Sequence, residues 1–309
     1  MSHAMAQSTL SMDSLPNEII IQVLNSFPTR SLLPLAAVCR RFYGLVGRVH
    51  FTRLVEAAQL QDHQVILECY HPSEKVTTPS LLCEYLGMDG LTEAGDSAKL
   101  GDLDDLYARF RPFAIDEEQG SRSRQSKLTA PSHGIFLDSD ESFSQLCTVT
   151  NLVKVGPRRG LFSSIANVND TVIRVWRDWL QREAAKTAAN QQQQGTSSTM
   201  DDSSILWTDS SKTVGLRFRV VEDRGAPAPI LFSRDEDPAV SYSLEYQELL
   251  IRANWLLLSF ETSEAQQVTH AGAVYYPGSG VVYHPCNTFL QCAPPTTSQF
   301  QTMATTFVM

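Results

Sequence analysis

The spacing of the apolar residues changes about sixty residues into the chain, and this change limits the fold more than any other feature of the sequence. Before it, apolar side chains recur three or four positions apart, the period of an α-helix. After it come short apolar runs separated by turn-forming residues, and Leu216, Phe218 and Val220 alternate with arginines as in a half-buried strand. The sequence therefore predicts an α+β protein, with a small helical module followed by a mainly antiparallel β domain.

Three short helices are predicted in the first fifty residues or so. Pro16 and Glu18 suit the first turn of a helix, and an apolar stripe runs from there until Pro28 ends it. A second helix is expected at residues 32–36 and a third at residues 38–49. Three short helices bury little apolar surface and leave some leucines exposed, which favours a protein partner on this module.

Three motifs in this module carry a resemblance. Leu15-Pro16-x-Glu18-Ile19, Leu32-Leu33-x-Leu35 and Val38-Cys39-Arg40-Arg41-Phe42 together resemble an F-box over residues 11–57. The resemblance implies a three-helix module that docks on a Skp-type adaptor and, through it, on cullin. It places six residues at or near the adaptor: Leu15, Pro16, Ile20, Leu32, Leu35 and Val38. It assigns six others to the F-box core: Ile19, Val23, Leu24, Phe27, Phe42 and Leu45.

The rest of the chain is expected to form one β domain over residues 62–293, resembling a sandwich with long loops. Its strand-like runs include residues 143–155, 205–207, 214–221, 230–232, 240–245 and 254–261, with a hairpin at 274–283 and a helix at 168–185. Polar and low-complexity composition predicts disordered loops at about 114–132 and 186–204, and a loose tail at 294–309. This region weakly resembles the C-terminal halves of fungal-type F-box proteins.

Charge separates the two regions as well. The total is −9, but residues 1–55 hold five arginines against Asp13 and Glu18, so they carry +3 and the remainder carries −12. An acidic body argues against nucleic acid as a partner, and the basic module suits a protein partner with an acidic surface.

No catalytic constellation, phosphate-binding loop or repeat of 20 to 50 residues is found in the sequence. Six cysteines are scattered without a C-x-x-C pair, which fits buried thiols in a reducing compartment. His284 and Cys286 flank a proline, and residues 235–237 are acidic, but neither has the ligand spacing of a metal site. We therefore expect no enzyme activity, cofactor or metal.

These features favour the substrate-recognition subunit of an SCF-type cullin–RING E3 ubiquitin ligase, with the β domain holding an unknown target protein. One alternative makes the β domain a lectin-like or small-ligand module that uses Trp207 and Trp255. Others are a non-ligase F-box scaffold, and an enzyme with an incidental helical start. With no secretory signal or long apolar run in the sequence, we expect a cytoplasmic or nuclear protein without membrane contact.

Overall fold

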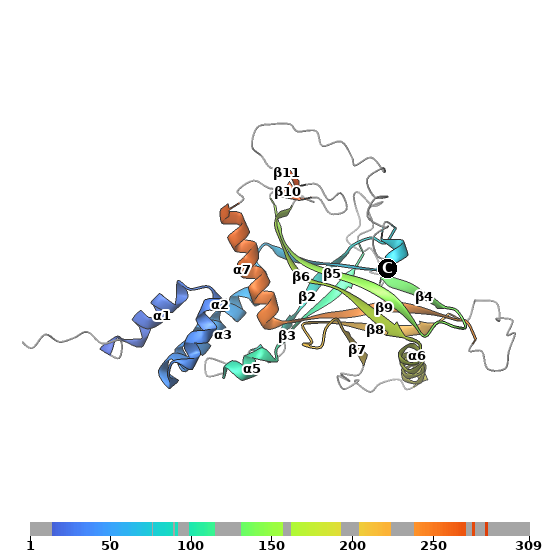
Figure 1. The fold of residues 1–309 in the computed structure, drawn as a ribbon, viewed down its shortest axis with the longest axis horizontal. Coiled ribbons are helices and arrows are strands. Elements are labelled where there is room, and N and C mark those ends of the chain that lie inside the picture. The colour runs from blue at the N-terminus through green and yellow to red at the C-terminus, as the bar shows by residue number, and fades with distance from the viewer. Residues whose placement is uncertain are drawn as a thin grey trace, which may run out of the picture.

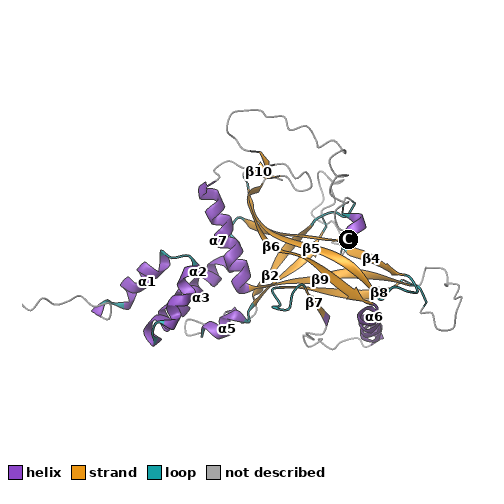
Figure 2. Cartoon of the chain, in the orientation of Figure 1, coloured by secondary structure: helices purple, strands orange, loops and turns teal. Residues whose placement is uncertain are grey.

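The computed structural model describes residues 14–75, 77–88, 90–91, 99–114, 131–156, 162–192, 204–223, 238–269, 274–275 and 282–283. Helices gather at the N-terminal end and strands make up the body, as Figure 2 shows by colour. Helix α7 (Ala253–Thr269) lies between the two regions (Figure 1). The fold is therefore α+β, as predicted, and α7 lies at the contact between its two regions.

The helical module contains α1 (Asn17–Asn25), α2 (Thr29–Leu32), the 3-10 helix η2 (Leu33–Ala37) and α3 (Arg40–Ala58). Each of the three α-helices begins after a residue with extended backbone: Pro16, Pro28 and Cys39. An extended residue at this position is the usual entry to a helix. Six buried side chains form the centre of the module: Ile20, Leu24, Leu32, Leu45, Val46 and Val49.

All of the described strands belong to one sheet, and every described pair is antiparallel. The strands are β1 (His63–Tyr70), β2 (Leu81–Met88), β3 (Tyr107–Phe113), β4 (Ser132–Leu137), β5 (Phe143–Val155), β6 (Phe162–Trp176), β7 (Ile205–Trp207), β8 (Val214–Glu222), β9 (Val240–Arg252), β10 (Val274–Tyr275) and β11 (Val282–Tyr283). Their order is β11-β10-β6-β5-β1-β2-β3-β9-β8-β7, with β4 paired to β9. The antiparallel character is as predicted, but one continuous sheet takes the place of the two sheets of a sandwich.

The sheet curves around a single core. Ala166 on β6 and Val214 on β8 stand far apart in the strand order, yet both belong to the same buried cluster. Phe110 on β3 and Leu244 on β9 are fully buried in this cluster. Each side chain of this kind contributes roughly 1.5–3 kcal/mol by leaving water.

Two long helices cover parts of the sheet. α6 (Arg177–Gln192) packs on β8 and β6, and α7 packs on β6, β5 and the module's α3. Two short elements complete the body: the 3-10 helix η3 (Pro72–Glu74) after β1, and α5 (Leu100–Asp104) before β3.

Three expectations about local structure were wrong. Residues 168–176 belong to strand β6, because they pair with β5 along its length; the predicted helix begins only at Arg177. Residues 254–261 form part of helix α7, not a strand. The predicted disordered loop at about 186–204 overlaps an ordered helix, since α6 continues to Gln192, whereas residues 115–130 of the other predicted loop lie outside the described residues.

Other expectations are confirmed. Strands occupy residues 143–155, 205–207, 214–221 and 240–245, and the pairing of Val274 with Tyr283 forms the expected hairpin. The predicted strand at 230–232, the acidic run at 235–237, His284, Cys286 and the tail at 294–309 lie outside the described residues.

Candidate functional site

Exposed apolar side chains are concentrated in the helical module. Among the described residues, six of the twelve large apolar side chains that are exposed lie between Ile19 and Tyr43. We call these six the exposed apolar set: Ile19, Val23, Phe27, Leu33, Val38 and Tyr43. Val38 is the most open of all twelve, at 66% exposed. Such a concentration on a small module is typical of a protein-binding surface.

The module is joined to the body by a charged contact. The Thr29 hydroxyl donates to Oε1 of Glu261 on α7 over 2.5 Å, and the Thr29 amide donates to Oε2 over 3.1 Å. Arg53 on α3 donates to the same Oε1 over 3.1 Å and to the Thr29 hydroxyl over 2.8 Å. Because Thr29 is buried, this contact fixes the start of α2 against α7.

A second polar contact lies further along the same interface. Nε2 of His50 is 2.8 Å from Oδ1 of Asn254, whose Nδ2 donates to Oδ1 of Asp104 over 2.7 Å. Since Asn254 uses its amide nitrogen on Asp104, its oxygen accepts from His50, and Nε2 of His50 carries the proton. Burial of His50 lowers its pKa, and its Nδ1 has no hydrogen-bond partner among the residues that the structure describes. His50 is therefore held neutral inside the interface.

Apolar packing completes this interface. Leu54 and Ala57 on α3 share a buried cluster with Leu103 of α5 and with Ala253 and Leu257 of α7. Leu54 and Leu103 are fully buried. The last two turns of α3 thus belong to the core of the body as much as to the module.

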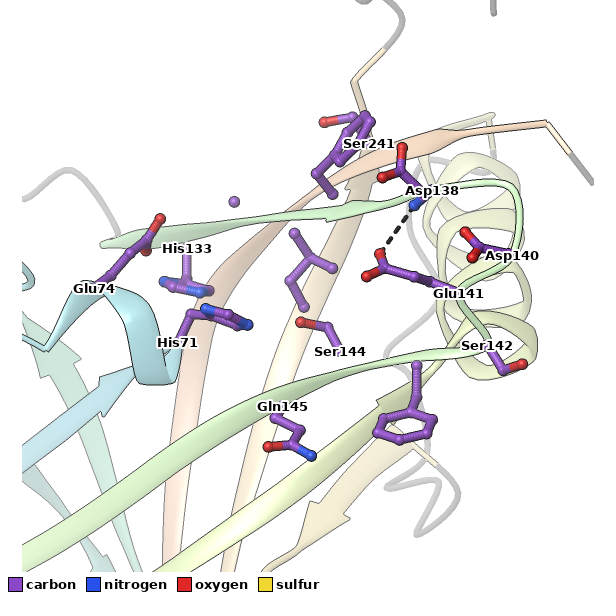
Figure 3. Close-up of a pocket in the computed structure, with 14 residues that line it drawn as sticks. His71, Glu74, His133, Asp138, Asp140, Glu141, Ser142, Ser144, Gln145 and Ser241 are labelled. Atoms are coloured by element: carbon purple, nitrogen blue, oxygen red, sulfur yellow. Dashed lines mark hydrogen bonds between the residues drawn. The ribbon is translucent and has the colours of Figure 1, made fainter. Parts of the chain in front are cut away.

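The body has a cleft of about 800 Å³ between β4, β5 and η3, as Figure 3 shows in close-up. Strand β4 lies at the end of the body that is far from the module (Figure 1). Four carboxylates line the cleft, and none of its fourteen lining residues is a lysine or an arginine. The carboxylates belong to Glu74, Asp138, Asp140 and Glu141. We call this feature the acidic cleft.

The turn between β4 and β5 is held from within the protein by Arg177, at the start of α6. Its guanidinium donates to the carbonyl oxygens of Asp138, Glu141 and Pro238, and is buried. Inside the turn, the Asp138 amide donates to Oε2 of Glu141 over 3.0 Å, the dashed bond in Figure 3. Arg177 uses main-chain oxygens, so it holds the turn in shape without pairing with its carboxylates.

Two histidines lie at the other end of the acidic cleft. In Figure 3 the rings of His133 on β4 and His71 before η3 point toward each other, close to Glu74. His71 is paired with Ser73, whose hydroxyl is 2.7 Å from its Nδ1. Burial lowers the pKa of His133, with Glu74 opposing the change. His133 is only 7% exposed, and its ring nitrogens are not among the described polar atoms that are closed off from solvent without a partner.

Within the described residues, no group of three or more His, Cys, Asp or Glu side chains is arranged to hold a metal ion. Burial raises the pKa of the Cys69 thiol to about 12, and that of Cys83 as well. Such thiols stay protonated at neutral pH and are poor nucleophiles. No described helix has the length and hydropathy needed to span a membrane.

Comparison with known proteins bears on the helical module. Residues 12–54 match the F-box-like family. The helical module is an F-box-like domain. No curated protein and no solved structure matches the chain. Because the family match ends at Leu54, the β body has to be interpreted from its own residues.

Only some of the residues that the sequence assigned to the F-box core are buried in the structure. Leu24 and Leu45 are buried as expected, and Phe42 packs against the buried cluster. Ile19, Val23 and Phe27 are 41–48% exposed, so their assignment to the core was wrong. The apolar stripe of α1 is wider than the contact it makes, and only its Ile20–Leu24 side faces α3.

The residues expected at the adaptor are also divided. Pro16 and Val38 are exposed, and Leu15 and Leu35 are half-buried. Ile20 and Leu32 were expected at the adaptor surface, but they are 2% and 0% exposed and lie in the F-box core. Of the residues expected at the adaptor, Leu15, Pro16 and Leu35 remain accessible, together with Val38 of the exposed apolar set.

Arg41 and Arg53 of the F-box have internal roles that sequence inspection missed. Arg53 joins Thr29 to Glu261, and Arg41 donates to Oδ1 of Asn17 over 2.9 Å and to the Leu15 carbonyl. The acidic cleft was missed as well, although Asp138, Asp140 and Glu141 form a visible run between two strand-like segments.

Proposed function

We propose that this F-box protein is the substrate-recognition subunit of an SCF-type cullin–RING ubiquitin ligase. The F-box binds a Skp-type adaptor, the adaptor binds cullin, and the body binds a target protein. One observation carries the proposal: the residues that match the F-box-like family also hold half of the exposed large apolar side chains among the described residues. A surface of this kind is stabilised when a partner covers it.

The chain supplies no chemistry in this role. It raises the effective concentration of the target's lysines near a ubiquitin-charged enzyme, which is carried by the other end of the complex. This role places the protein in the cytoplasm, the nucleus or both.

The firm joint between module and body supports this role. A receptor has to present its target at a defined position, and a flexible joint would spread the target over a larger volume. Here α3 runs without a break from the F-box into the core of the body, and Glu261 and Asn254 bind the two regions side by side.

Reconstitution with purified components tests the proposal. The full-length chain is mixed with a Skp-type adaptor and then with cullin and its RING subunit, and the mixture is separated by size exclusion. We expect the chain to elute with all three proteins. An adaptor already filled by another F-box protein is the control and should leave the chain unbound. If the chain and the free adaptor elute separately when mixed at micromolar concentrations, the proposal fails.

A second candidate function is glycan or small-ligand binding by the body. The observation that favours it is a second cleft, of about 630 Å³, where Trp176 and Trp207 lie together and Trp176 is 49% exposed. Trp255, the other tryptophan considered for this role, lies on α7 and does not line this cleft. A sugar that raises the melting temperature of the native chain, but not that of Trp176→Ala, would support this candidate.

A further inference from the structure

Strands β4 and β5 follow each other directly in the chain but do not pair. Only five residues, 138–142, join them. Among the described strands β4 pairs with β9 alone, while residues 143–146 of β5 pair with β6 alone, because β1 joins β5 only from Cys147. Each strand therefore keeps one main-chain edge without a described partner, and the acidic cleft lies between these two edges (Figure 3). An edge of this kind is a template for an added strand.

The lining of the acidic cleft favours a positively charged ligand. Its four carboxylates face no lysine or arginine among the lining residues. Glu74 and Asp140 are exposed, and neither side chain has a salt bridge among the described residues. A cationic side chain that entered the acidic cleft would find the opposite charge already in place.

His133 points to a ligand independently of the acidic residues. It is more than nine-tenths buried, points into the acidic cleft, and lacks a hydrogen-bond partner in the described chain. Its ring nitrogens are not among the polar atoms closed off from solvent, so they are open to the acidic cleft and can donate to or accept from a ligand there. A main-chain amide or carbonyl group of an added strand is a partner of this kind.

We propose that the acidic cleft receives an extended, basic segment of the target protein, which adds as a strand between β4 and β5. The inference rests on the proposed role as a substrate receptor and names the class of segment that the receptor reads. Main-chain hydrogen bonds to the two strand edges hold the segment, and the carboxylates select its charge.

The position of the charges defines the segment more closely. Glu74 lies near His133 at one end of the acidic cleft, and the turn with Asp138 and Asp140 lies at the other. From His133 to Asp138 the strand advances roughly 17 Å, at about 3.3 Å per residue. The matching segment has lysine or arginine at two positions about four to six residues apart. Ile135 and Phe143 also line the acidic cleft and favour an apolar residue in the segment.

Selection from a random library of linear octapeptides on phage, with the full-length chain as bait, tests the proposal. We expect enrichment of peptides with two basic residues at this spacing. A selected peptide should bind the Glu74→Lys, Asp140→Lys double variant at least about tenfold more weakly than the native chain. Methylation of its alternate amide nitrogens should abolish binding, because methylated amides cannot donate to a strand edge.

The matched control is Glu56→Lys with Asp170→Lys, which changes net charge equally at exposed residues that do not line the acidic cleft. It should bind the peptide within about twofold of the native chain. A library that yields no peptide, selected peptides without basic residues, or equal binding by the Glu74→Lys, Asp140→Lys variant would overturn the proposal. Adaptor binding is measured on every preparation. Its absence from the native chain would count against the ligase role, whereas retained adaptor binding without peptide selection would count against the acidic cleft alone.

Discussion

The hydroxyl of Thr29, in the F-box, lies 2.5 Å from the carboxylate of Glu261, which is 232 positions later in the chain. The Thr29 amide and Arg53 bind the same carboxylate. One carboxylate of the body thus accepts hydrogen bonds from the first residue of α2 and from an arginine of the F-box. The orientation of the F-box on the body depends on this contact.

Replacing Glu261 should loosen the F-box from the body. In Glu261→Ala, Thr29 and Arg53 lose their shared acceptor, so we expect the free energy of unfolding to fall by about 1–3 kcal/mol. Amide hydrogen exchange should rise at residues 29–32. The comparison variant is Glu245→Ala, whose half-exposed pair with Arg219 should contribute less than about 1 kcal/mol. Equal effects of the two substitutions would show that the Glu261 contact has no special role.

Leu54→Ala should destabilise the whole protein. Leu54 is fully buried between the F-box and α7, so the cavity should lower the free energy of unfolding by about 2–5 kcal/mol. Leu86→Ala, on β2 and 37% exposed, should lower it by less than about 1 kcal/mol in the same urea titration. A Leu54→Ala loss no larger than that of Leu86→Ala would mean that the regions are not packed together. A fragment ending near residue 60 would expose Leu54, so binding is best measured on the full chain.

Acid should weaken the protein through its buried histidines. Burial lowers the pKa of His50 below its ordinary value of 6.5, and the nearby charge of Arg53 lowers it further. The carboxylates of Glu261 and Asp104 oppose this change. The unfolded chain therefore takes up the proton first. The stability from neutral His50 is complete above pH 6.5 and is lost as the pH falls from there through the folded pKa.

The measurement is urea denaturation of the native chain and of His50→Gln between pH 7.5 and 5. The glutamine side chain of this variant can still donate to Asn254 but does not titrate, so the variant should lose less stability on acidification, by at most about 1.4 kcal/mol per pH unit. His63, whose pKa is also lowered by burial, remains in both proteins. Parallel pH curves for the two proteins would contradict the assignment of a neutral His50.

Gly215 should not tolerate a side chain. A Cβ atom there would lie 2.7 Å from side-chain atoms of both Ile205 and Trp207 on the paired strand β7. We expect Gly215→Ala to lower the free energy of unfolding by about 1–3 kcal/mol and to change the fluorescence of Trp207. Gly44→Ala, in α3 with open space around it, should instead raise stability by about 1 kcal/mol, and a gain at both positions would refute the expected clash.

The sequence predicts the kind of each region better than the placement of single residues. The F-box motifs and alternating strands reflect local rules, and both regions have the predicted character. The α1 stripe, however, does not reveal which side faces inward, because Ile19 and Ile20 are equally apolar and only the position of α3 separates them.

The wrong predictions for the body have the same cause: a local pattern does not show which segment a residue packs against or pairs with. Residues 255–258 are a continuous apolar run, which fits a buried strand and a buried helix equally well. Val172 and Val175 fit a helical stripe with Trp179, but pairing with β5 keeps them in a strand. The acidic cleft gathers residues from three separate segments. Its position depends on β4 and β5 pairing with different strands, which no local pattern reveals.

The most direct test of the ligase role is the affinity of the full-length chain for a purified Skp-type adaptor, measured by titration calorimetry. Val23→Asp with Val38→Asp places two charges in the exposed apolar set, so binding should weaken by at least about a hundredfold while the melting temperature stays unchanged. The control, Val172→Asp, is 55% exposed on β6 of the body and should bind like the native chain. Tight binding by the native chain and the control, and its loss in the double variant, is the predicted result. Equal binding by all three proteins, or none by the native chain, would contradict it.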